Sequence, residues 1–330
     1  MIMSGNASSP ALSILIVNWK SVTFLEQCLR TIYRETKSLS YEVIVVDNAS
    51  FDGSEEMVHR EFPQVVFVQS RDNLGFSRGN NLAFERSRGK YILFLNPDTE
   101  IVGDALGKLA NCLESDSKAG VVGPKLLNSD GSLQTSCVQA FPTILNQAFD
   151  AEALRRLFPK ASLWGVRSLY RADPFPEEVD VISGASLMIR REVFEKVGQF
   201  TTEYFMYAED VDLCYKVHSA GWGVLYFAGA TVVHHGGQSS GKKAESNFAV
   251  VMNRKSLYSF FKIRRGAWYA GAFRASSGLF AVFRLALLFA LYCVTFGKYA
   301  DGSLPASFSK WRSVFRWSVG LESIAESSAK

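Results

Sequence analysis

Three groups of polar residues could supply catalytic chemistry in this chain of 330 residues. Asn96-Pro97-Asp98 follows the apolar run Tyr91–Leu95, which places a carboxylate where a buried strand would end. Far downstream come the acidic pair Glu209-Asp210 and the histidine pair His234-His235. Carboxylates and a histidine gathered at one cleft can bind a divalent cation and supply a general base. This combination suits displacement of a diphosphate leaving group.

Asp98 is the candidate metal ligand. Mg²⁺ takes oxygen ligands, usually one or two carboxylates plus substrate phosphates. An imidazole from His234 or His235 would move the preference toward Mn²⁺. Asn-Pro-Asp is also ordinary turn chemistry, and a histidine at the end of a strand is more often structural. The position of Asp98 directly after a buried strand, and the presence of two of the four histidines at one place, favour a functional interpretation.

Glu209-Asp210 is the candidate source of a general base. It follows the aromatic segment Tyr204-Phe205-Met206-Tyr207, which can form an apolar wall. Such a wall desolvates a carboxylate and raises its pKa toward the range of a useful base. The alternative is the acidic first turn of a helix, stabilised by the helix dipole. Residues 213–220 have a helical pattern, so both interpretations can hold together.

Two earlier segments could bind a nucleotide. Asp47 ends the apolar run Val43–Val46 and could accept the ring N–H of a pyrimidine, although Asp-Asn-Ala-Ser also suits a turn. In the segment 71–81, Gly75 and Gly79 permit close backbone approach and Arg78 could contact a phosphate. The spacing matches neither a dinucleotide loop nor a Walker loop, and a glycine-rich helix entry is the alternative.

The elements that must position these residues alternate between strand and helix from Leu12 to Gly123. This alternation predicts an α/β fold with a mostly parallel, doubly wound sheet and helices on both faces. Ligands of such sheets bind at the carboxyl ends of the strands. Strands are expected at 14–17, 43–46, 65–68, 91–95, 121–122, 181–185 and 187–189, and helices at 22–34, 54–61, 77–86, 103–114, 190–197 and 213–220.

The composition of the chain argues against one functional class and indicates a cellular compartment. The formal net charge is +4, and the basic residues are not massed in the first two-thirds of the chain, which does not indicate a nucleic-acid-binding protein. Five cysteines without a Cys-x-x-Cys pair indicate reduced thiols in a cytoplasmic setting. Residues 1–10 lack the apolar core of a signal peptide, so we expect a flexible leader rather than secretion.

The end of the chain changes character. Gly278–Phe296 is apolar apart from Arg284 and a few small or hydroxyl residues, and its length is at the lower limit for a membrane-spanning helix. Phe308, Trp311 and Phe315 then recur at helical spacing among basic residues, a pattern typical of an interfacial helix. We therefore expect C-terminal hydrophobic and amphipathic helices that contact a membrane surface. The alternative is a hydrophobic hairpin packed on the catalytic domain.

The motifs together resemble those of a family 2 glycosyltransferase of the rhamnosyltransferase-like branch, which has a Rossmann-like GT-A fold. The matching segments occur in order between about Leu12 and Ser240. They are Ile16-Val17-Asn18-Trp19, 46–54, Asn73-Leu74-Gly75-Phe76, Gly79-Asn80-Asn81, Leu95-Asn96-Pro97-Asp98, Ser183-Gly184-Ala185, 207–213, Ala220-Gly221-Trp222 and 234–239.

The resemblance implies a role for particular residues. Asp210 is the expected catalytic base, with Glu209 beside it. Asp98 is expected to contact a Mg²⁺ or Mn²⁺ ion and the diphosphate, and His234, rather than His235, to complete the metal site. The expected donor-binding residues are Asn18, Asp47, Asn73, Gly75, Arg78, Asn80, Asn96 and Asp98. The expected acceptor or sugar pocket contains Gly184, Ala185 and Tyr207.

The resemblance also implies an activity and a domain plan. We expect inverting transfer of a single sugar, rhamnose from a dTDP donor, to a saccharide or polyprenyl-linked acceptor in cell-surface polysaccharide synthesis. The enzyme would work at the inner face of the cytoplasmic membrane. Residues 11–245 would form the transferase domain, with a nucleotide-sugar half at 11–125 and an acceptor half at 126–245. Residues 246–330 would form the membrane-associating region.

Two departures from the family pattern and two alternative functions remain. Asn96 replaces the first aspartate of the usual metal motif, which predicts weaker metal affinity. The Gln-x-x-Arg-Trp segment of processive synthases is missing, which favours single additions.

A sugar-phosphate nucleotidyltransferase is one alternative, but Asn18-Trp19-Lys20-Ser21 stands where its glycine-rich basic loop would be. A non-catalytic saccharide-binding protein on the same fold is the other.

Overall fold

The computed structural model describes residues 9–149, 157–158, 161–171, 174–236, 247–294 and 303–321. They belong to two compact units. The first comprises Met1–Phe141, Pro159–Thr202 and Glu209–Ser239, and the second comprises Pro142–Phe158, Glu203–Ala208 and Ser240–Lys330. The second unit thus takes in 142–158 and 203–208 as well as the expected C-terminal region. Most of the expected leader, and the last two residues of the expected apolar segment 278–296, lie outside the described residues.

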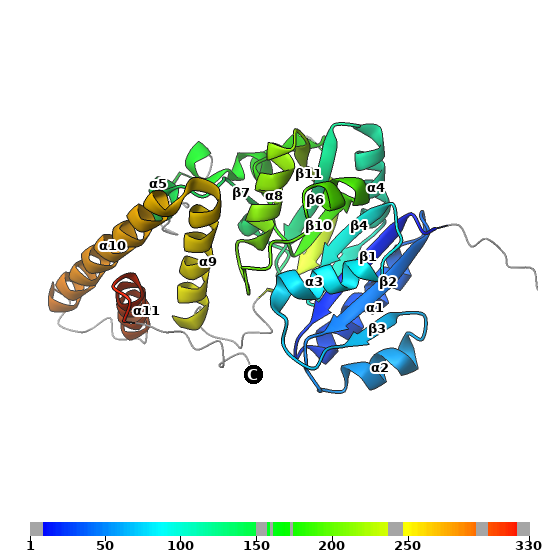
Figure 1. Cartoon of the computed structure of the whole chain (residues 1–330), viewed down its shortest axis with the longest axis horizontal. Coiled ribbons are helices and arrows are strands. Elements are labelled where there is room, and N and C mark those ends of the chain that lie inside the picture. The colour runs from blue at the N-terminus through cyan, green and yellow to red at the C-terminus, as the bar shows by residue number, and fades with distance from the viewer. Residues whose placement is uncertain are drawn as a thin grey trace, which may run out of the picture. The chain divides into compact units, whose positions relative to one another are not determined.

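The first unit is built around a large mixed sheet with the strand order β3-β2-β1-β4-β10-β6-β11-β5 (Figure 1). β8 pairs with β11 beyond this path, and β7 and β9 form a separate pair. The strands are β1 (Leu12–Asn18), β2 (Tyr41–Asp47), β3 (Val66–Gln69), β4 (Tyr91–Leu95), β5 (Thr99–Val102), β6 (Ala119–Leu127), β7 (Val138–Gln139), β8 (Glu177–Glu178), β9 (Val181–Ile182), β10 (Ser186–Arg190) and β11 (Gly223–His234).

The core of the sheet is its parallel part, because β1, β2 and β4 are covered on both faces. Ile14, Ile44 and Leu93 have no exposed surface, as expected for continuous apolar strands between two layers of helices. β1 pairs in parallel with both β2 and β4. The chain runs outward from β1 to β3 and then returns to the other side of β1, which creates a topological switch point at the carboxyl ends of these strands.

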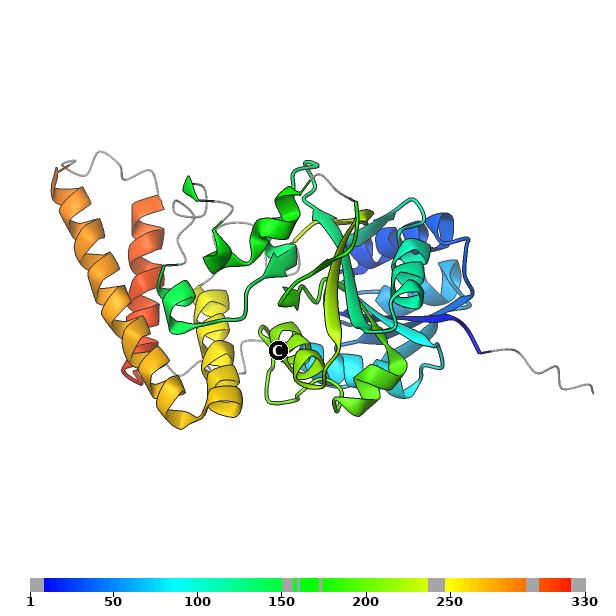
Figure 2. The ribbon, with the colours of Figure 1, turned by 90° about the horizontal axis from the view of Figure 1, so that it is seen from above.

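Helices flank the sheet of this unit on both sides. Right-handed crossovers place α1 and α3 on opposite faces, as Figure 2 shows. The helices are α1 (Val22–Glu35), α2 (Ser54–Glu61), α3 (Gly75–Glu85), α4 (Ala105–Ser115), α7 (Arg191–Lys196) and α8 (Glu209–Ser219), with 3₁₀ turns η1 (Thr135–Cys137), η2 (Ser162–Trp164) and η3 (Val166–Tyr170). The predicted mostly parallel α/β fold is confirmed.

Three local predictions differ from the structure. The run expected as one strand at 181–185 stops at Ile182, because the chain bends through Gly184 before β10 pairs with β4. β5 was not expected, because its four residues directly follow Asn96-Pro97-Asp98, which was interpreted only as a strand end or a turn. α8 begins at Glu209 instead of residue 213, so the acidic pair occupies the first turn of a helix. The alternative interpretation of that pair as a helix start is therefore correct as to structure.

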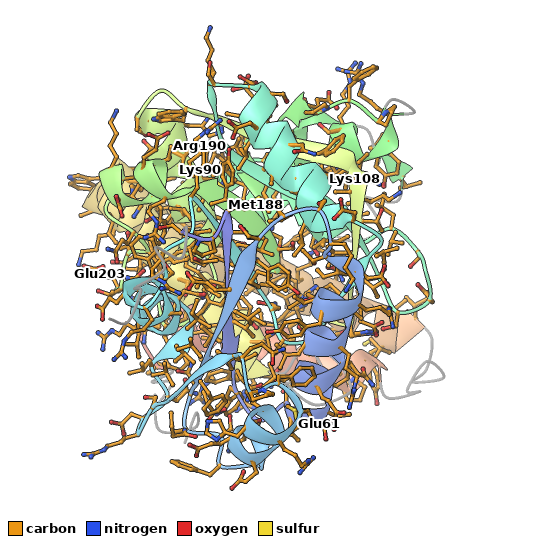
Figure 3. All side chains as sticks on the ribbon, turned by 90° about the vertical axis from the view of Figure 1, so that its right-hand side faces the viewer. Glu61, Lys90, Lys108, Met188, Arg190 and Glu203 are labelled. Atoms are coloured by element: carbon orange, nitrogen blue, oxygen red, sulfur yellow. The ribbon has the colours of Figure 1, made fainter. Side chains whose placement is uncertain are left out.

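The opposite end of the sheet is held by basic side chains. Lys90 and Arg190 lie beside each other where β4 begins and β10 ends (Figure 3). Lys90 forms an ion pair of 2.6 Å with Glu114, and the Nε of Arg190 donates to the carbonyl of Ala119 at 2.8 Å. These contacts join the end of α4 to the strands. The cations at this end therefore have structural partners, and the polar residues available for chemistry lie at the carboxyl ends of the parallel strands.

The second unit is helical. Its long helices are α9 (Asn247–Arg265), α10 (Ala267–Val294) and α11 (Ser303–Ser318). The short α5 (Ile144–Ala148) belongs to the same unit. Phe260, Phe261 and Phe273 are fully or almost fully buried and form its core with Trp317. Among the described residues, α10 alone is long and apolar enough to cross a membrane.

Candidate active site

Four strands of the parallel core end in polar side chains at one edge of the sheet. Asn18, Asp47 and Gln69 terminate β1, β2 and β3, and Asn96 follows β4. The parallel register aligns Asn18 with Asp47 and Asp47 with Gln69. Since all of these strands point the same way, their ends meet at the switch point where ligands of α/β sheets bind. This edge is the candidate donor site.

Asp47 is the centre of a closed hydrogen-bond network. Its Oδ1 accepts from Asn18 Nδ2 at 2.7 Å, and its Oδ2 accepts from the Ser50 amide and from Gln69 Nε2, both at 2.8 Å. Its side chain is almost fully buried. Two carboxylate oxygens offer about four acceptor positions, so one position remains for a ligand N–H. The hydrogen bond from the Ser50 amide closes an Asx turn, so the turn that was the alternative interpretation of Asp-Asn-Ala-Ser is also present.

The glycine-containing segment forms the entry to α3. Gly75 has a φ of +72°, and its amide donates to Asn73 Oδ1 at 3.0 Å. Asn48 Nδ2 donates to the Gly75 carbonyl at 3.1 Å, which ties this entry to the end of β2. Arg78 is exposed on the first turn of α3, where a phosphate could reach it. Asn80 is buried and donates to the Phe76 carbonyl, so in this state its amide faces the protein.

Asp98 and His234 lie together. Asp98 Oδ1 is 3.3 Å from His234 Nε2, and Asn96 Nδ2 is 3.2 Å from the same nitrogen. His234 Nδ1 lies 2.7 Å from Gln134 Oε1. An amide oxygen can only accept, so Nδ1 donates, and Nε2 can then accept from Asn96 Nδ2 or turn its lone pair toward a cation. Two acceptors held at 3.3 Å repel each other unless a proton or a cation lies between them. This pair therefore fits a divalent ion that takes its remaining ligands from a substrate.

His235 has different partners. Its Nε2 is 2.8 Å from Glu100 Oε1, its Nδ1 is 2.8 Å from Ser129 Oγ, and its ring packs on Phe24. Both nitrogens are thus engaged within the protein. The hydrogen bonds favour His234 over His235 as a ligand. The described residues contain no group of three or more His, Cys, Asp or Glu side chains with metal-site geometry, so the protein itself offers two ligating side chains and an adjacent amide.

The acidic pair is fixed at the start of α8. Asp210 Oδ2 accepts the Gly184 amide at 2.9 Å, and Oδ1 accepts the Val211 amide at 2.8 Å. Desolvation raises the pKa of Asp210, although these two amides oppose the shift. Burial, reinforced by the charge of Asp210, raises the pKa of Glu209 to about 8. Glu209 Oε2 is buried, and no described residue hydrogen bonds to it. The pair therefore combines a Glu209 whose pKa lies above neutral pH with an Asp210 whose carboxylate accepts two backbone amides.

A series of hydrogen bonds connects the base candidate to the metal candidate. Asp210 accepts from Gly184, and the next residue, Ala185, accepts the Asn96 amide at 3.0 Å. Asn96 in turn contacts His234, which is beside Asp98. Gly184 is tightly enclosed, because a Cβ atom there would lie 3.3 Å from Phe76 Cζ and 3.4 Å from Asp210 Cβ. The loop from β9 to β10 thus brings the three predicted functional side chains to one region.

Some residues of this region were not predicted from the sequence. Gln134 sets the tautomer of His234 from 100 positions away, Gln69 holds Asp47, and Phe76 packs at Gly184. Nothing in the sequence around Gln134 signals this contact, whereas Gln69 ends an apolar strand in the same way as Asp47. Tyr207 belongs to the second unit, and its φ of +70° is followed by +64° at Ala208. Its predicted place in the acceptor pocket stays a prediction.

Comparisons with known proteins identify the family of this chain. The sequence profile described as glycosyl transferase family 2 matches residues 13–198. An N-acetylglucosaminyl-diphospho-decaprenol L-rhamnosyltransferase of Mycobacterium tuberculosis is 28% identical over 274 residues, which cover 80% of this chain and 88% of the relative. The rhamnosyltransferase WbbL of Escherichia coli is 26% identical over 231 residues, covering 67% of this chain and 82% of the relative.

Solved structures support the fold. A mannosyltransferase from Pyrobaculum calidifontis, determined with GDP-mannose and Mn²⁺, superposes with a TM-score of 0.56 at 18% identity and covers 96% of this chain and 88% of its own. The GT-A fold and glycosyltransferase activity predicted from the motifs are confirmed. The sequence match extends over more than half of the chain and includes Asn18, Asp47, Asp98 and Gly184. The chain belongs to glycosyl transferase family 2, whose members invert the configuration of the transferred sugar.

Proposed function

We propose that this chain transfers a single rhamnose from dTDP-rhamnose to a polyprenyl-linked saccharide during surface glycan synthesis. The observation that carries the proposal is the hydrogen-bonded series from Asp210 through Gly184, Ala185 and Asn96 to His234 and Asp98. It places a base candidate and a cation-binding pair in the same region. Inverting transfer needs these two functions, one at each side of the anomeric carbon.

Asp210 is the proposed catalytic base. Its carboxylate removes the proton of an acceptor hydroxyl while the oxygen attacks the anomeric carbon and the bond to the diphosphate breaks. The raised pKa of Asp210 suits this role, because a base works best when its pKa approaches the working pH. The amides of Gly184 and Val211 orient the carboxylate, and a protonated Glu209 adds no second negative charge beside it.

The proposed cation site consists of Asp98 and His234, with Asn96 beside them. A divalent ion bound there would offset the negative charge that develops on the departing diphosphate. Gln134 accepts from Nδ1 of His234 and so directs the Nε2 lone pair toward Asp98 and Asn96. Replacement of an acidic residue by Asn96 removes one negative charge, so the ion is expected to bind more tightly once the diphosphate supplies further oxygen ligands.

The proposed donor site lies at the ends of β1 to β4. The remaining acceptor position of Asp47 can take the ring N–H of thymine, Arg78 can contact the diphosphate, and Asn73 and Gly75 shape the loop between them. The donor sugar and the lipid-linked acceptor are inferred from the names of the mycobacterial and Escherichia coli relatives. A lipid-linked acceptor would require the enzyme to work at the cytoplasmic face of a membrane.

A donor and acceptor screen tests the proposal. The purified full chain is incubated with Mn²⁺, a polyprenyl-diphosphate-linked N-acetylglucosamine and, in turn, dTDP-rhamnose, UDP-sugars and GDP-sugars. We expect nucleoside diphosphate release that needs the acceptor and is fastest with dTDP-rhamnose, and a product of inverted anomeric configuration by NMR. Preference for another nucleotide-sugar would refute the rhamnose assignment, and retained configuration would refute the single-base mechanism.

A further inference from the structure

The second half of α10 exposes an unusually continuous apolar surface. Leu279, Phe289 and Val294 are 73%, 62% and 76% exposed, and Val282, Phe283 and Leu287 are at least half exposed. A core helix of a soluble protein would bury most of such residues, yet only 17% of the most apolar window of α10 is buried. We call Leu279–Val294 the α10 tip. Its apolar surface is large enough to mark an interaction site.

The first half of α10 is packed inside the helical unit. Ala270, Phe273 and Ser277 are buried there, and Arg274 donates to the carbonyls of Trp317 and Ser318, both at 3.0 Å. α10 and α11 therefore run antiparallel as a hairpin, with the two helices side by side in Figure 2. α11 also packs along one side of the tip, where Ala281 is buried and Arg284 contacts Trp311, so the remaining sides of the tip are left exposed.

The only charge of the α10 tip is turned toward the protein. Arg284 is half-buried, and its guanidinium lies 5.6 Å from the centre of the Trp311 ring of α11. A cation on an aromatic face is stabilised by the ring, most strongly where water is excluded. An exposed arginine would oppose insertion into hydrocarbon. This contact leaves the outer surface of the tip free of charge.

The length of the tip decides between crossing a membrane and entering one leaflet. At about 1.5 Å per residue, Leu279–Val294 measures about 24 Å, whereas the hydrocarbon core is about 30 Å thick. The packed first half of α10 cannot supply the missing length, since its buried residues hold the hairpin together. The tip is therefore long enough to enter a bilayer but too short to span it.

The charges of the helical unit identify the kind of partner. α9, α10 and α11 contain ten Lys and Arg residues and no Asp or Glu. Arg312 is exposed and Lys310 half-exposed beside Trp311, which contacts Arg284 in the first half of the tip. Anionic lipid headgroups complement such a set of cations. A second copy of this chain docked through the same helices would instead bring like charges together.

We propose that the α10 tip inserts into a single leaflet of an anionic membrane without crossing it, with Lys310 and Arg312 at the level of the headgroups. The inference rests on the membrane contact proposed above and adds its topology. It anchors the helical unit to the surface from which a polyprenyl-linked acceptor would be drawn. Because the tip is distinct from the candidate active site, the anchor and the chemistry can be tested separately.

A native cysteine reports the topology. Cys293 is exposed near the end of the tip, whereas the other four cysteines are buried. Full-length protein is mixed with phosphatidylglycerol-containing vesicles, and a membrane-impermeant maleimide is added outside or trapped inside. We expect rapid labelling without lipid, and protection from both reagents once the protein floats with the vesicles. Labelling from inside would show a spanning helix, and undiminished labelling of floated protein from outside would show surface adsorption; either result overturns the proposal.

Two further outcomes would also contradict the insertion. Failure to float would refute membrane contact itself, while transfer to a soluble acceptor analogue would still report an intact catalytic unit. Protection of Cys293 without lipid, together with a doubled mass in sedimentation, would assign the surface to a second copy of the chain.

A matched pair of variants tests which end of α10 inserts. Phe289→Asp places a charge on the tip, and Trp268→Asp places the same charge at the packed end, where Trp268 is 94% exposed. Neither residue belongs to the core, so both variants should fold. We expect Phe289→Asp to lower the vesicle-bound fraction by about tenfold and Trp268→Asp to leave it unchanged. Equal losses would indicate a helix lying flat on the surface and would overturn insertion by the tip.

Discussion

At the scale of single residues, the acidic pair shows how one buried environment acts differently on two neighbouring carboxyl groups. Asp210 receives two backbone amides and stays the better base, whereas no described residue hydrogen bonds to Oε2 of the buried Glu209. Burial raises the pKa of both groups, and the Asp210 charge raises that of Glu209 further. Glu209, with a pKa of about 8, is therefore mostly protonated at neutral pH.

The raised pKa of Glu209 predicts a pH-dependent stability. Between the unfolded value of about 4.3 and the folded value of about 8, the folded chain keeps a proton that the unfolded chain has released, so the free energy of unfolding falls as pH rises. Glu209→Gln should remove this fall and stabilise the protein at pH 9 by about 1 to 3 kcal/mol relative to wild type. Denaturant unfolding at pH 5 and pH 9 measures it.

The exposed Glu203, labelled in Figure 3, gives the matched control. Glu203→Gln should leave the pH dependence of unfolding as it is in the wild type. If Glu209→Gln and Glu203→Gln behave alike, Glu209 is not held protonated in the folded chain.

Substitutions of the two neighbouring histidines are expected to differ in their effect on metal binding. His234→Gln should weaken Mn²⁺ binding in the presence of nucleoside diphosphate at least about tenfold, since it removes the lone pair beside Asp98. Gln134→Leu should weaken it about tenfold by releasing the His234 tautomer. His235→Gln is the control and should change little. Titration of the free Mn²⁺ signal by electron paramagnetic resonance measures all three, and a reversed order of the two histidines would refute the assignment.

Sequence reasoning could reach Asp98, Asp210 and His234 because each follows or ends an apolar run, and strand ends meet at one edge. The residues alone could not separate His234 from His235, because adjacent identical residues differ only in their partners, and the preference for His234 came from the family resemblance. Gln134 and the Ser129–Glu100 pair, which distinguish them, come from distant loops and strands. The hydrogen-bond network around Asp47 could likewise not be predicted from the sequence, since Gln69 joins it only through the register of β2 and β3.

At the scale of elements, the bend between β9 and β10 positions the candidate site. A continuous strand was expected across Gly184, because 181–189 is almost wholly apolar or small. The structure instead ends β9 at Ile182, where it pairs with β7, and uses Ser183–Ala185 to reach Asp210 and Asn96. Periodicity alone cannot detect such a bend, since the residues on either side of it are equally buried.

This bend predicts the effect of a single methyl group. Gly184→Ala would bring a Cβ to 3.3 Å from Phe76 Cζ, so the ring must shift by a few tenths of an ångström, and to 3.4 Å from Asp210 Cβ, which is an ordinary contact. Because the shifted ring and Asp210 flank the same Cβ, we expect kcat to fall by less than about tenfold with little change in Tm. Steady-state kinetics and thermal unfolding on the same preparations measure both.

Gly271→Ala is the control for this substitution. Gly271 lies inside α10 with open space around its Cβ position, so alanine there should keep kcat and slightly raise Tm. If Gly184→Ala retains full kcat, the tight enclosure of Asp210 is not needed for turnover.

At the scale of the whole molecule, charge is distributed unevenly. The formal net charge is only +4, but ten of the 36 cationic side chains and none of the 32 acidic ones lie in α9, α10 and α11. The rest of the chain is therefore net negative. The sequence already suggested a basic, apolar C-terminal region. That the apolar surface is confined to one end of α10 could be seen only once the packing of α11 was known.

This distribution predicts a salt-sensitive membrane contact. Raising the ionic strength from about 0.05 to about 0.5 M shortens the Debye length and should lower binding to phosphatidylglycerol-containing vesicles several-fold. Binding to neutral phosphatidylcholine vesicles, driven by the apolar tip alone, should be weaker and almost independent of salt. Co-sedimentation measures both. Equal binding to the two kinds of vesicle would show that the cations do not contribute.

Comparison of Asp210→Asn with Asp212→Asn tests the central claim most directly. Asp212 is fully buried and accepts a hydrogen bond from Thr201 at 2.6 Å, so its loss should lower Tm while most of the turnover is kept. For Asp210→Asn we predict kcat lower by about 10²- to 10⁴-fold, with Tm and the Kd for donor nearly unchanged. Near-wild-type turnover by a folded Asp210→Asn protein would contradict its assignment as the base.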